Sequence, residues 1–374
     1  MKPPSVHSLW RDPAVIRRFR SGVSLHGHTM HSQECLSFLP RYLHQIPGVS
    51  QFIRRRQGRL PGGRPGLDFS RAWWTPPLSP ASALRVEREQ IGGLGLHPLV
   101  SLTDHDDIEA SAALGITTER SEVPVSVEWT VPYGQSILHL GIHNLPAGAD
   151  RSWMAAMREY TEAPGDARLP ELLSSLARIP ETLIVLHHPF WREEGVGEAA
   201  HQCALDRFLQ ECLEWIHAFE LNGTRPWREN AAAIALAQAH GVPTISGGDR
   251  HACEPAACLN LTNARSFSEF AAEIRQGSSV VLVMPQYREP LGLRFLEAMW
   301  DILRPYPEYP GRERWTDRIF YRGDDGLARP LSVVWQDRAP WALHGAAGIV
   351  QILATTKLRS ALRLLLAERG EVFP

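Results

Sequence analysis

Short apolar runs alternate along most of this chain with longer segments whose apolar residues recur at helical spacing. The short runs predict strands at 22–25, 99–102, 123–127, 136–140, 183–186, 216–221, 243–246 and 279–284. The longer segments predict helices at 81–94, 170–178, 204–214, 230–240 and 267–275. Strands that alternate with helices in this way are typical of a parallel sheet covered by helices.

Two regions depart from this alternation. Residues 36–80 predict an insertion after the first strand, because they hold the basic run at 54–59, a Gly/Pro-rich stretch and the pair Trp73-Trp74. Residues 286–374 predict a mostly helical C-terminal extension, with helices at 290–304 and 343–368 and one further strand at 331–335. The sequence therefore predicts one main domain over residues 1–285, followed by this extension.

Side chains that can bind a metal follow most of the predicted strands. In a closed barrel of parallel strands, these carboxyl ends form one rim, and active sites lie there. An open doubly wound sheet would instead concentrate the chemistry at one switch point. Because six rim positions carry such residues, we expect an α/β fold of the TIM-like barrel type.

Composition limits the classes of function. The net charge of −2 gives no overall field for nucleic acid or an acidic membrane. The five cysteines have no C-x-x-C spacing and predict reduced thiols in a cytoplasmic protein. No apolar run is long enough for a transmembrane helix, and the arginine-rich start is unlike a secretory signal.

The pair His26 and His28 gives the first indication of chemistry. Side chains two residues apart on a strand point to the same side, so both imidazoles can face one metal ion. Further nitrogen and carboxylate candidates follow later strands: Asp104, His105, Glu128, His139, His188, Asp249 and His251. Such donors suit Zn, Mn or Fe, and one carboxylate can bridge two ions so that a water between them becomes the hydroxide nucleophile.

The order of these motifs resembles the PHP family, the polymerase and histidinol phosphatase domain. The matching pieces are Leu25-His26-Gly27-His28-Thr29, Leu102-Thr103-Asp104-His105-Asp106, Val127-Glu128, His139, His188-Pro189 and Gly248-Asp249-Arg250-His251. Amidohydrolases also begin with His-x-His, but many bridge their metals with a carboxylated lysine, and this chain has no lysine between Lys2 and Lys357. The resemblance implies a distorted (β/α)7 barrel that holds two or three divalent ions.

The resemblance also implies a division of the ligands. His26, His28, Glu128 and Asp249 would hold the first ion, Glu128, His139 and His188 the second, and His105 and His251 a third. For the third ion we favour Glu34 as a further ligand, with His31 as the alternative. His187 is ambiguous, and the position directly before proline favours His188 as the ligand and His187 as core.

Three polar side chains near these motifs have candidate roles in catalysis. Asp104 either caps the helix that follows it or orients an imidazole or carries a proton. Arg192 and Arg250 are candidate phosphate clamps, although each could be a surface arginine. Glu220 and Asn222 end a strand and could shape the pocket without binding metal.

We expect a metal-dependent phosphoesterase that acts on a small phosphorylated substrate or a nucleotide. The alternatives are hydrolysis of a non-phosphate bond by the same cluster, and a non-catalytic scaffold. The 54–59 run is expected to be a solvated surface, but with Trp73 and Trp74 it could form a lid over a nucleotide or a nucleic-acid end. The sequence indicates no membrane partner, and it does not indicate an oligomeric state.

Overall fold

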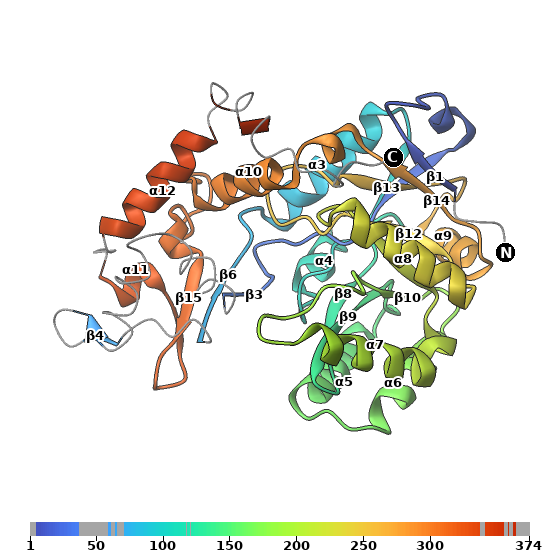
Figure 1. The fold of residues 1–374 in the computed structure, drawn as a ribbon, viewed down its shortest axis with the longest axis horizontal. Coiled ribbons are helices and arrows are strands. Elements are labelled where there is room, and N and C mark those ends of the chain that lie inside the picture. The colour runs from blue at the N-terminus through green and yellow to red at the C-terminus, as the bar shows by residue number, and fades with distance from the viewer. Residues whose placement is uncertain are drawn as a thin grey trace.

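The computed structural model describes residues 5–36, 71–336 except 117 and 120, and 341–354, with the short pieces 59–60, 64–65, 358 and 362–363. It shows a mixed α/β fold with several sheets (Figure 1). The basic residues 54–58 and most of the predicted last helix beyond 354 lie outside these residues.

The first of two five-stranded sheets has the order β1-β14-β13-β2-β7. Its strands are β1 (Ser5–Ser8), β2 (Ser21–Ser24), β7 (His97–Val100), β13 (Cys258–Thr262) and β14 (Val280–Val283). β2 and β7 are parallel, with Ser24 opposite Val100. The two strands therefore bring the residues after Ser24 and after Val100 to the same end of this sheet.

The second five-stranded sheet has the order β12-β11-β10-β9-β8. Its strands are β8 (Val127–Tyr133), β9 (Ser136–His143), β10 (Leu183–Leu186), β11 (Ala218–Asn222) and β12 (Thr244–Gly247). β10, β11 and β12 are parallel, as the sequence predicts. Their carboxyl ends carry His187, Asn222 and Gly247-Gly248-Asp249.

Backbone bridges connect the two sheets at that same end. Gly27, just after β2, pairs with Arg250, just after β12, and His105 after β7 pairs with Glu128 in β8. Hydrogen bonds from Gly248 N to Leu25 O (2.7 Å) and from His28 N to Arg250 O (2.8 Å) strengthen the first link. These links gather the motifs in one place, whereas the closed (β/α)7 barrel itself stays a prediction.

One strand in each five-stranded sheet runs against its neighbours: β9 is antiparallel to β8 and β10, and β13 is antiparallel to β2 and β14. Only Gly134 and Gln135 separate β8 from β9, and a connection of two residues can make a hairpin but not a crossover. Gly134 has a φ of 60°, which a hairpin turn of this kind requires. The strand expected at 123–127 is also displaced, because it begins at Val127 and continues to Tyr133. Glu128 consequently lies near the start of a strand.

Helices cover the sheets at the five segments where the periodicity predicts them and at two further segments. These helices are α3 (Pro80–Gly93), α4 (Glu109–Leu114), α5 (Asp150–Glu162), α6 (Arg168–Ala177), α7 (Glu198–Cys212), α8 (Trp227–His240) and α9 (Phe267–Arg275), with 3-10 turns at Val15–Arg18 and Leu213–Trp215. The periodicity did not predict α4 and α5. The largest buried cluster packs α5, α6 and α7 against β8, β9 and β10 around Trp129 and Phe208. This packing holds one sheet as a rigid support for the residues at its end.

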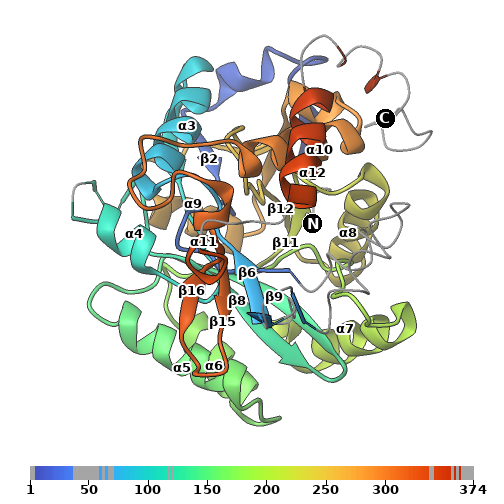
Figure 2. The same ribbon diagram turned by 90° about the vertical axis from the view of Figure 1, so that its left-hand side faces the viewer.

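A four-stranded sheet of order β16-β15-β6-β3 lies beside the larger sheets (Figures 1 and 2). Its strands are β3 (Glu34–Cys35), β6 (Ala72–Trp74), β15 (Ile319–Arg322) and β16 (Ala328–Pro330). β6 and β15 are antiparallel neighbours, so the end of the predicted insertion and the C-terminal extension form one sheet. A separate two-stranded pair consists of β4 (Arg59–Leu60) and β5 (Arg64–Pro65).

The C-terminal extension contains helices in its described part, but the strand expected at 331–335 is wrong. That segment is the short helix α11 (Leu331–Val334), in which Leu331 and Trp335 lie one turn apart and are both buried against the four-stranded sheet. The other elements are α10 (Leu291–Leu303), α12 (Trp341–Leu353) and 3-10 turns at Pro285–Arg288 and Trp315–Asp317. The division of the chain at residue 285 stays a prediction.

Among the residues that the structure describes, no helix combines the length and the apolar character that crossing a membrane requires.

Candidate metal centre

The predicted ligands come together where the two larger sheets meet. His26, His188 and Asp249 lie directly after or close to the ends of β2, β10 and β12 and have φ values of 60°, 21° and 48°. Such left-handed backbone is unfavourable for residues other than glycine, and it persists where surrounding structure enforces it. The turns after three strands are therefore held in unusual conformations that aim these side chains at one point.

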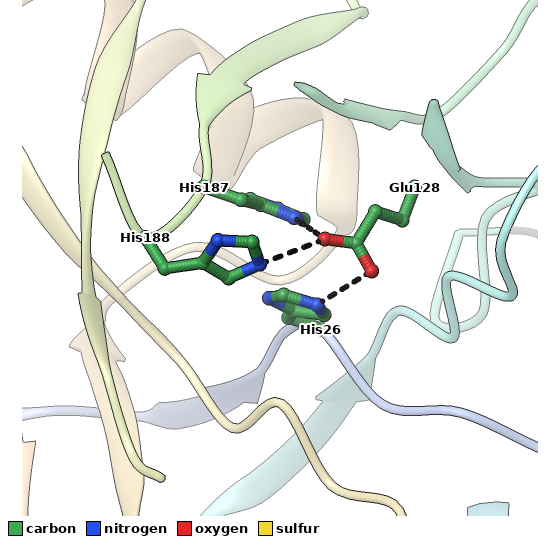
Figure 3. Close-up of side chains that lie close together, drawn as sticks. All are labelled: His26, Glu128, His187 and His188. Atoms are coloured by element: carbon green, nitrogen blue, oxygen red, sulfur yellow. Dashed lines mark hydrogen bonds and ion pairs between the residues drawn. The ribbon is translucent and has the colours of Figure 1, made fainter. Parts of the chain in front are cut away.

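Glu128 is the centre of the cluster. Its side chain is fully buried, and three imidazoles face each of its two oxygens. Around Oε2, the ring nitrogens lie at 2.9 Å (His26), 3.3 Å (His28) and 3.3 Å (His105). Around Oε1, they lie at 3.0 Å (His187), 3.1 Å (His188) and 3.5 Å (His139), and Figure 3 shows the part formed by His26, His187 and His188. One carboxylate thus divides six imidazoles into two groups.

Asp249 extends the group around Oε2. Its Oδ1 lies 3.6 Å from Nε2 of both His26 and His28 and 3.3 Å from Nδ1 of His251. These three residues, His26, His28 and Asp249, offer ligand atoms close enough to share one ion. The set expected for the first ion is therefore brought together, although its role as a ligand set stays a prediction.

Glu34 lies with the residues expected at the third ion. Its Oε2 is 3.1 Å from His251 Nε2 and 3.5 Å from His105 Nε2, and its Oε1 is 3.7 Å from His28 Nδ1. His31 is exposed to solvent. The geometry favours Glu34 over His31 for this position.

Burial and the facing charges shift the pKa values of several residues in the cluster away from their usual ranges. Burial alone would raise the pKa of Glu128, but the facing His26, His105 and His139 lower it well below the usual range of a carboxyl group. Burial would likewise lower the pKa of His251, and the carboxylates of Glu34 and Asp249 instead raise it to about 9. Burial dominates at His28 and lowers its pKa to about 3. His28 is therefore neutral and keeps a free lone pair at neutral pH.

Three buried imidazole nitrogens have no hydrogen-bond partner among the described residues, one of them His143 Nε2, and the other two face the central carboxylate. These two atoms are His28 Nε2 and His139 Nδ1, and each faces an oxygen of Glu128. Unsatisfied buried polar atoms are rare in folded proteins, and neutral imidazole is a common metal ligand. The donor set and these orphaned atoms fit divalent ions.

Glu220 and Asn222 make hydrogen bonds to residues of the cluster. Glu220 Oε1 lies 2.5 Å from His26 Nδ1, and its Oε2 accepts hydrogen bonds from His188 N (2.9 Å) and Asn222 Nδ2 (2.9 Å). Asn222 also donates to Asp249 Oδ2 at 3.1 Å. A carboxylate on one ring nitrogen leaves the other available for a metal. These contacts suit Glu220 and Asn222 to position His26, His188 and Asp249, whereas the sequence suggested only that they shape the pocket without binding metal.

Asp104 holds the loop that carries His28. It accepts hydrogen bonds from Thr29 N (2.5 Å) and Thr29 Oγ1 (2.7 Å), and burial raises its pKa to about 7 despite these donors. The N-cap residue of α4 is Ile108, and just before it Asp107 Oδ1 accepts from Glu109 N at 2.8 Å. Asp104 therefore fits the orienting role and not the helix-cap role.

The two arginines expected to bind phosphate do not face the cluster through any described contact. Arg250 is buried, and its guanidinium donates to Glu87 Oε1 (2.9 Å), Ala252 O (2.9 Å) and His28 O (3.2 Å). Arg192 is exposed and donates to Val196 O at 2.9 Å. The buried carboxylate of Glu87 argues against phosphate binding by Arg250, and no described contact of Arg192 supports it, so both roles stay predictions.

Glu87→Gln is expected to lower the free energy of unfolding by about 3 kcal/mol or more, because it leaves the buried Arg250 charge without a counter-ion. Urea denaturation monitored by circular dichroism measures this loss. Glu89→Gln is the matched control on the same helix, since Glu89 and its partner Arg85 are exposed, and its effect should stay within about 0.5 kcal/mol. Equal stability of the two variants would contradict the structural role of Arg250.

His187 was expected to be core, and the structure contradicts this expectation. Its Nδ1 lies 3.0 Å from Glu128 Oε1, and its ring stacks on His26 with centroids 3.8 Å apart. Sequence reasoning also passed over His143, which is fully buried with its ring 5.9 Å from that of His187. In the sequence, His139, Gly141 and His143 occupy alternate positions of one strand and so face the same side. The structure shows why a glycine lies between the two histidines, because a Cβ at position 141 would lie 2.1 Å from His187 Nε2.

Comparisons with known proteins give only distant similarities. No family model and no curated protein matches the chain. One similar solved structure is an amidohydrolase from Chromobacterium violaceum with bound sulfate and no metal, at 15% identity and a TM-score of 0.35, covering 61% of this chain and 87% of the other. Another is a candidate metal-dependent phosphoesterase from Bifidobacterium adolescentis, at 14% identity and a TM-score of 0.32, covering 54% of this chain and 92% of the other. The function must therefore be argued from the site.

Proposed function

We propose that this protein is a metal-dependent phosphoesterase whose ions are held by the cluster around Glu128. The observation that carries the proposal is the division of six imidazoles between the two oxygens of this one buried carboxylate. Such a carboxylate is suited to bridge two cations. When bound, two or more divalent ions would activate a water as nucleophile and stabilise the charge on the phosphate oxygens.

The chain's own residues prepare the site for those ions. Glu220 Oε1 lies on His26 Nδ1, so the Nε2 of His26, which faces Glu128 and Asp249, is the ring nitrogen that would bind an ion. Asp104 fixes the Thr29 backbone and thereby the direction of the preceding His28. The carboxylates of Glu220 and Asp104 therefore hold His26 and His28 in place, so these side chains need to move less when a metal binds.

Support for a phosphate substrate comes from the order of the sequence motifs. It also comes from the lack of any lysine between Lys2 and Lys357, because many amidohydrolases bridge their metals with a carboxylated lysine. The described arginines do not line the cluster, so the charge of a phosphate would be neutralised by the bound ions and by the histidines around them. Zn, Mn and Fe all suit the donor set.

The proposal is tested by elemental analysis together with a substrate panel. Protein purified without chelator, or reconstituted with Mn or Zn, should hold about two or more equivalents per chain and should hydrolyse phosphomonoesters or phosphodiesters. In oxygen-18 water, single-turnover hydrolysis should place the label in the released phosphate. Less than about one equivalent after reconstitution, activity confined to amides, or label in the alcohol product would each refute it.

A further inference from the structure

A further buried histidine, His143, lies next to the imidazoles that surround Glu128 Oε1. It is the last residue of β9, and it faces the same side of that strand as Gly141 and His139. Its ring is fully buried, and the centroid of the His187 ring is 5.9 Å away. A buried polar ring in this place can act on the metal centre through its neighbour.

Two buried serines determine which nitrogen of His143 carries a proton. Ser101 Oγ lies 2.7 Å from His143 Nδ1 and donates to Ser126 Oγ at 2.8 Å. Because a hydroxyl group has one hydrogen, Ser101 accepts a hydrogen bond from His143 Nδ1 and does not donate one to it. Burial disfavours the charged form of an imidazole, so His143 has a single proton on Nδ1 and a lone pair on Nε2.

The Nε2 atoms of His143 and His187 border the same small space beside Gly141. A Cβ at position 141 would lie 2.8 Å from His143 Nε2 and 2.1 Å from His187 Nε2. Because glycine has no side chain, a hydrogen bond between the two rings, direct or through one water, can form there. His143 Nε2 has no hydrogen-bond partner among the described residues, and a buried acceptor without a donor is unfavourable. A proton on His187 Nε2 supplies that donor.

A proton on Nε2 leaves Nδ1 of His187 available for a cation. This Nδ1 lies 3.0 Å from Glu128 Oε1 (Figure 3), and His26 stacks on the ring at 3.8 Å with an interplanar angle of 16°. A lone pair so close to a carboxylate oxygen is repulsive unless a cation lies beside both. His26, Glu128, His187 and His188 offer ligand atoms within 4.8 Å of one another, close enough to share one ion.

We propose that His143 is a positioning residue that holds His187 with its proton on Nε2, so that His187 Nδ1 is a further metal ligand beside Glu128 Oε1. This inference rests on the metal centre of the proposed function, and it adds one ligand and the support of that ligand. Histidines that bind a metal usually donate their second N–H to a fixed acceptor, and His143 Nε2 is that acceptor here.

Nitrogen-15 NMR of histidine-labelled, zinc-loaded protein reports which ring nitrogens carry protons. The signals of His187 are identified by their loss in His187→Gln. In the wild type, His187 Nε2 should be protonated and His187 Nδ1 should be bound to zinc. His143→Leu removes the acceptor and should shift these signals. His143→Gln places an amide oxygen where Nε2 lies and should restore them, which a role in packing alone does not require.

Zinc affinity, measured by competition with a chelator, is the second readout. His143→Leu should weaken zinc binding about 10- to 100-fold, and His143→Gln should recover most of that loss. Ser101→Ala is a smaller change in the same chain of contacts, and it should weaken zinc binding in the same direction even if His143→Leu does not fold.

His217→Leu is the matched control. His217 Nδ1 accepts a hydrogen bond from Ile184 N at 2.9 Å, but His217 precedes β11, at the end of the strand opposite Asn222. This variant should lower stability without changing zinc affinity or the signals of His187.

The proposal would be overturned by a zinc-loaded wild type with His187 protonated on Nδ1, or by unchanged signals and zinc affinity in His143→Leu. Neither measurement uses a substrate, so the two proposals fail separately. Zinc binding with the expected His187 signals but without hydrolysis of any phosphate ester refutes only the phosphoesterase. Phosphate ester hydrolysis by a protein whose His187 binds no zinc refutes only the role of His143.

Discussion

Replacing Glu128 with glutamine is expected to reduce hydrolysis at least about 10³-fold while the protein stays folded. The neutral amide presents one oxygen and one N–H donor to the two groups of imidazoles, so it cannot serve both as an anionic ligand. The loss corresponds to several kcal/mol of transition-state stabilisation. Steady-state kinetics with saturating Mn or Zn measures the rate, and elemental analysis measures the lost ions.

A folded control is essential for this prediction. Glu171→Gln changes an exposed carboxylate that pairs with Arg168 on α6, and it should leave the rate unchanged. The near-native thermal midpoint of Glu128→Gln would separate loss of chemistry from loss of fold. Activity within about tenfold of the wild type would mean that Glu128 does not bridge ions.

Replacing Gly247 with alanine is expected to destabilise the protein and to lower its metal affinity about 10- to 100-fold. A Cβ at this position would lie 1.6 Å from Glu220 Oε1 and 2.5 Å from its carboxyl carbon. Glu220 cannot move aside without losing its contacts to His26, to the His188 backbone and to Asn222. The buried Nδ1 of His26 would then lose its partner, at a cost of about 1–3 kcal/mol in addition to the strain.

Metal titration and urea denaturation measure the two effects. Gly92→Ala adds the same methyl group within α3, where nothing lies within 4 Å, and should be neutral or slightly stabilising. The double variant Gly247→Ala/Glu220→Ala removes the clash but also removes the contacts of Glu220 to His26, His188 and Asn222, so it should recover neither the full stability nor the metal affinity. Tight metal binding by Gly247→Ala would show that Glu220 does not orient His26.

Local sequence patterns predicted much of the framework. The apolar periodicity predicted α3, α6, α7, α8 and α9, and the short apolar runs predicted the parallel strands β10, β11 and β12. The spacing of His26 and His28 predicted a common direction, and both rings do reach Glu128 Oε2. These features depend on residues close together in the chain, which is why a periodic pattern can reveal them.

Long-range contacts decided the rest. Whether Arg250 is free for a ligand depends on Glu87, which is distant in sequence and lies on α3. The pairing of β6 with β15 joins two segments whose local patterns gave no sign of each other. Such partners are selected by tertiary packing, because a buried charge or an open strand edge is satisfied by whatever the fold brings beside it.

The sequence by itself determined the types of side chain in the centre and the strand ends that present them. Only the tertiary structure decided how they are shared: three imidazoles on each oxygen of Glu128, His187 among them, and Glu34 beside His251. The physical reason is that residue type fixes what a group can bind, whereas the backbone turns at His26, His188 and Asp249 fix where it points.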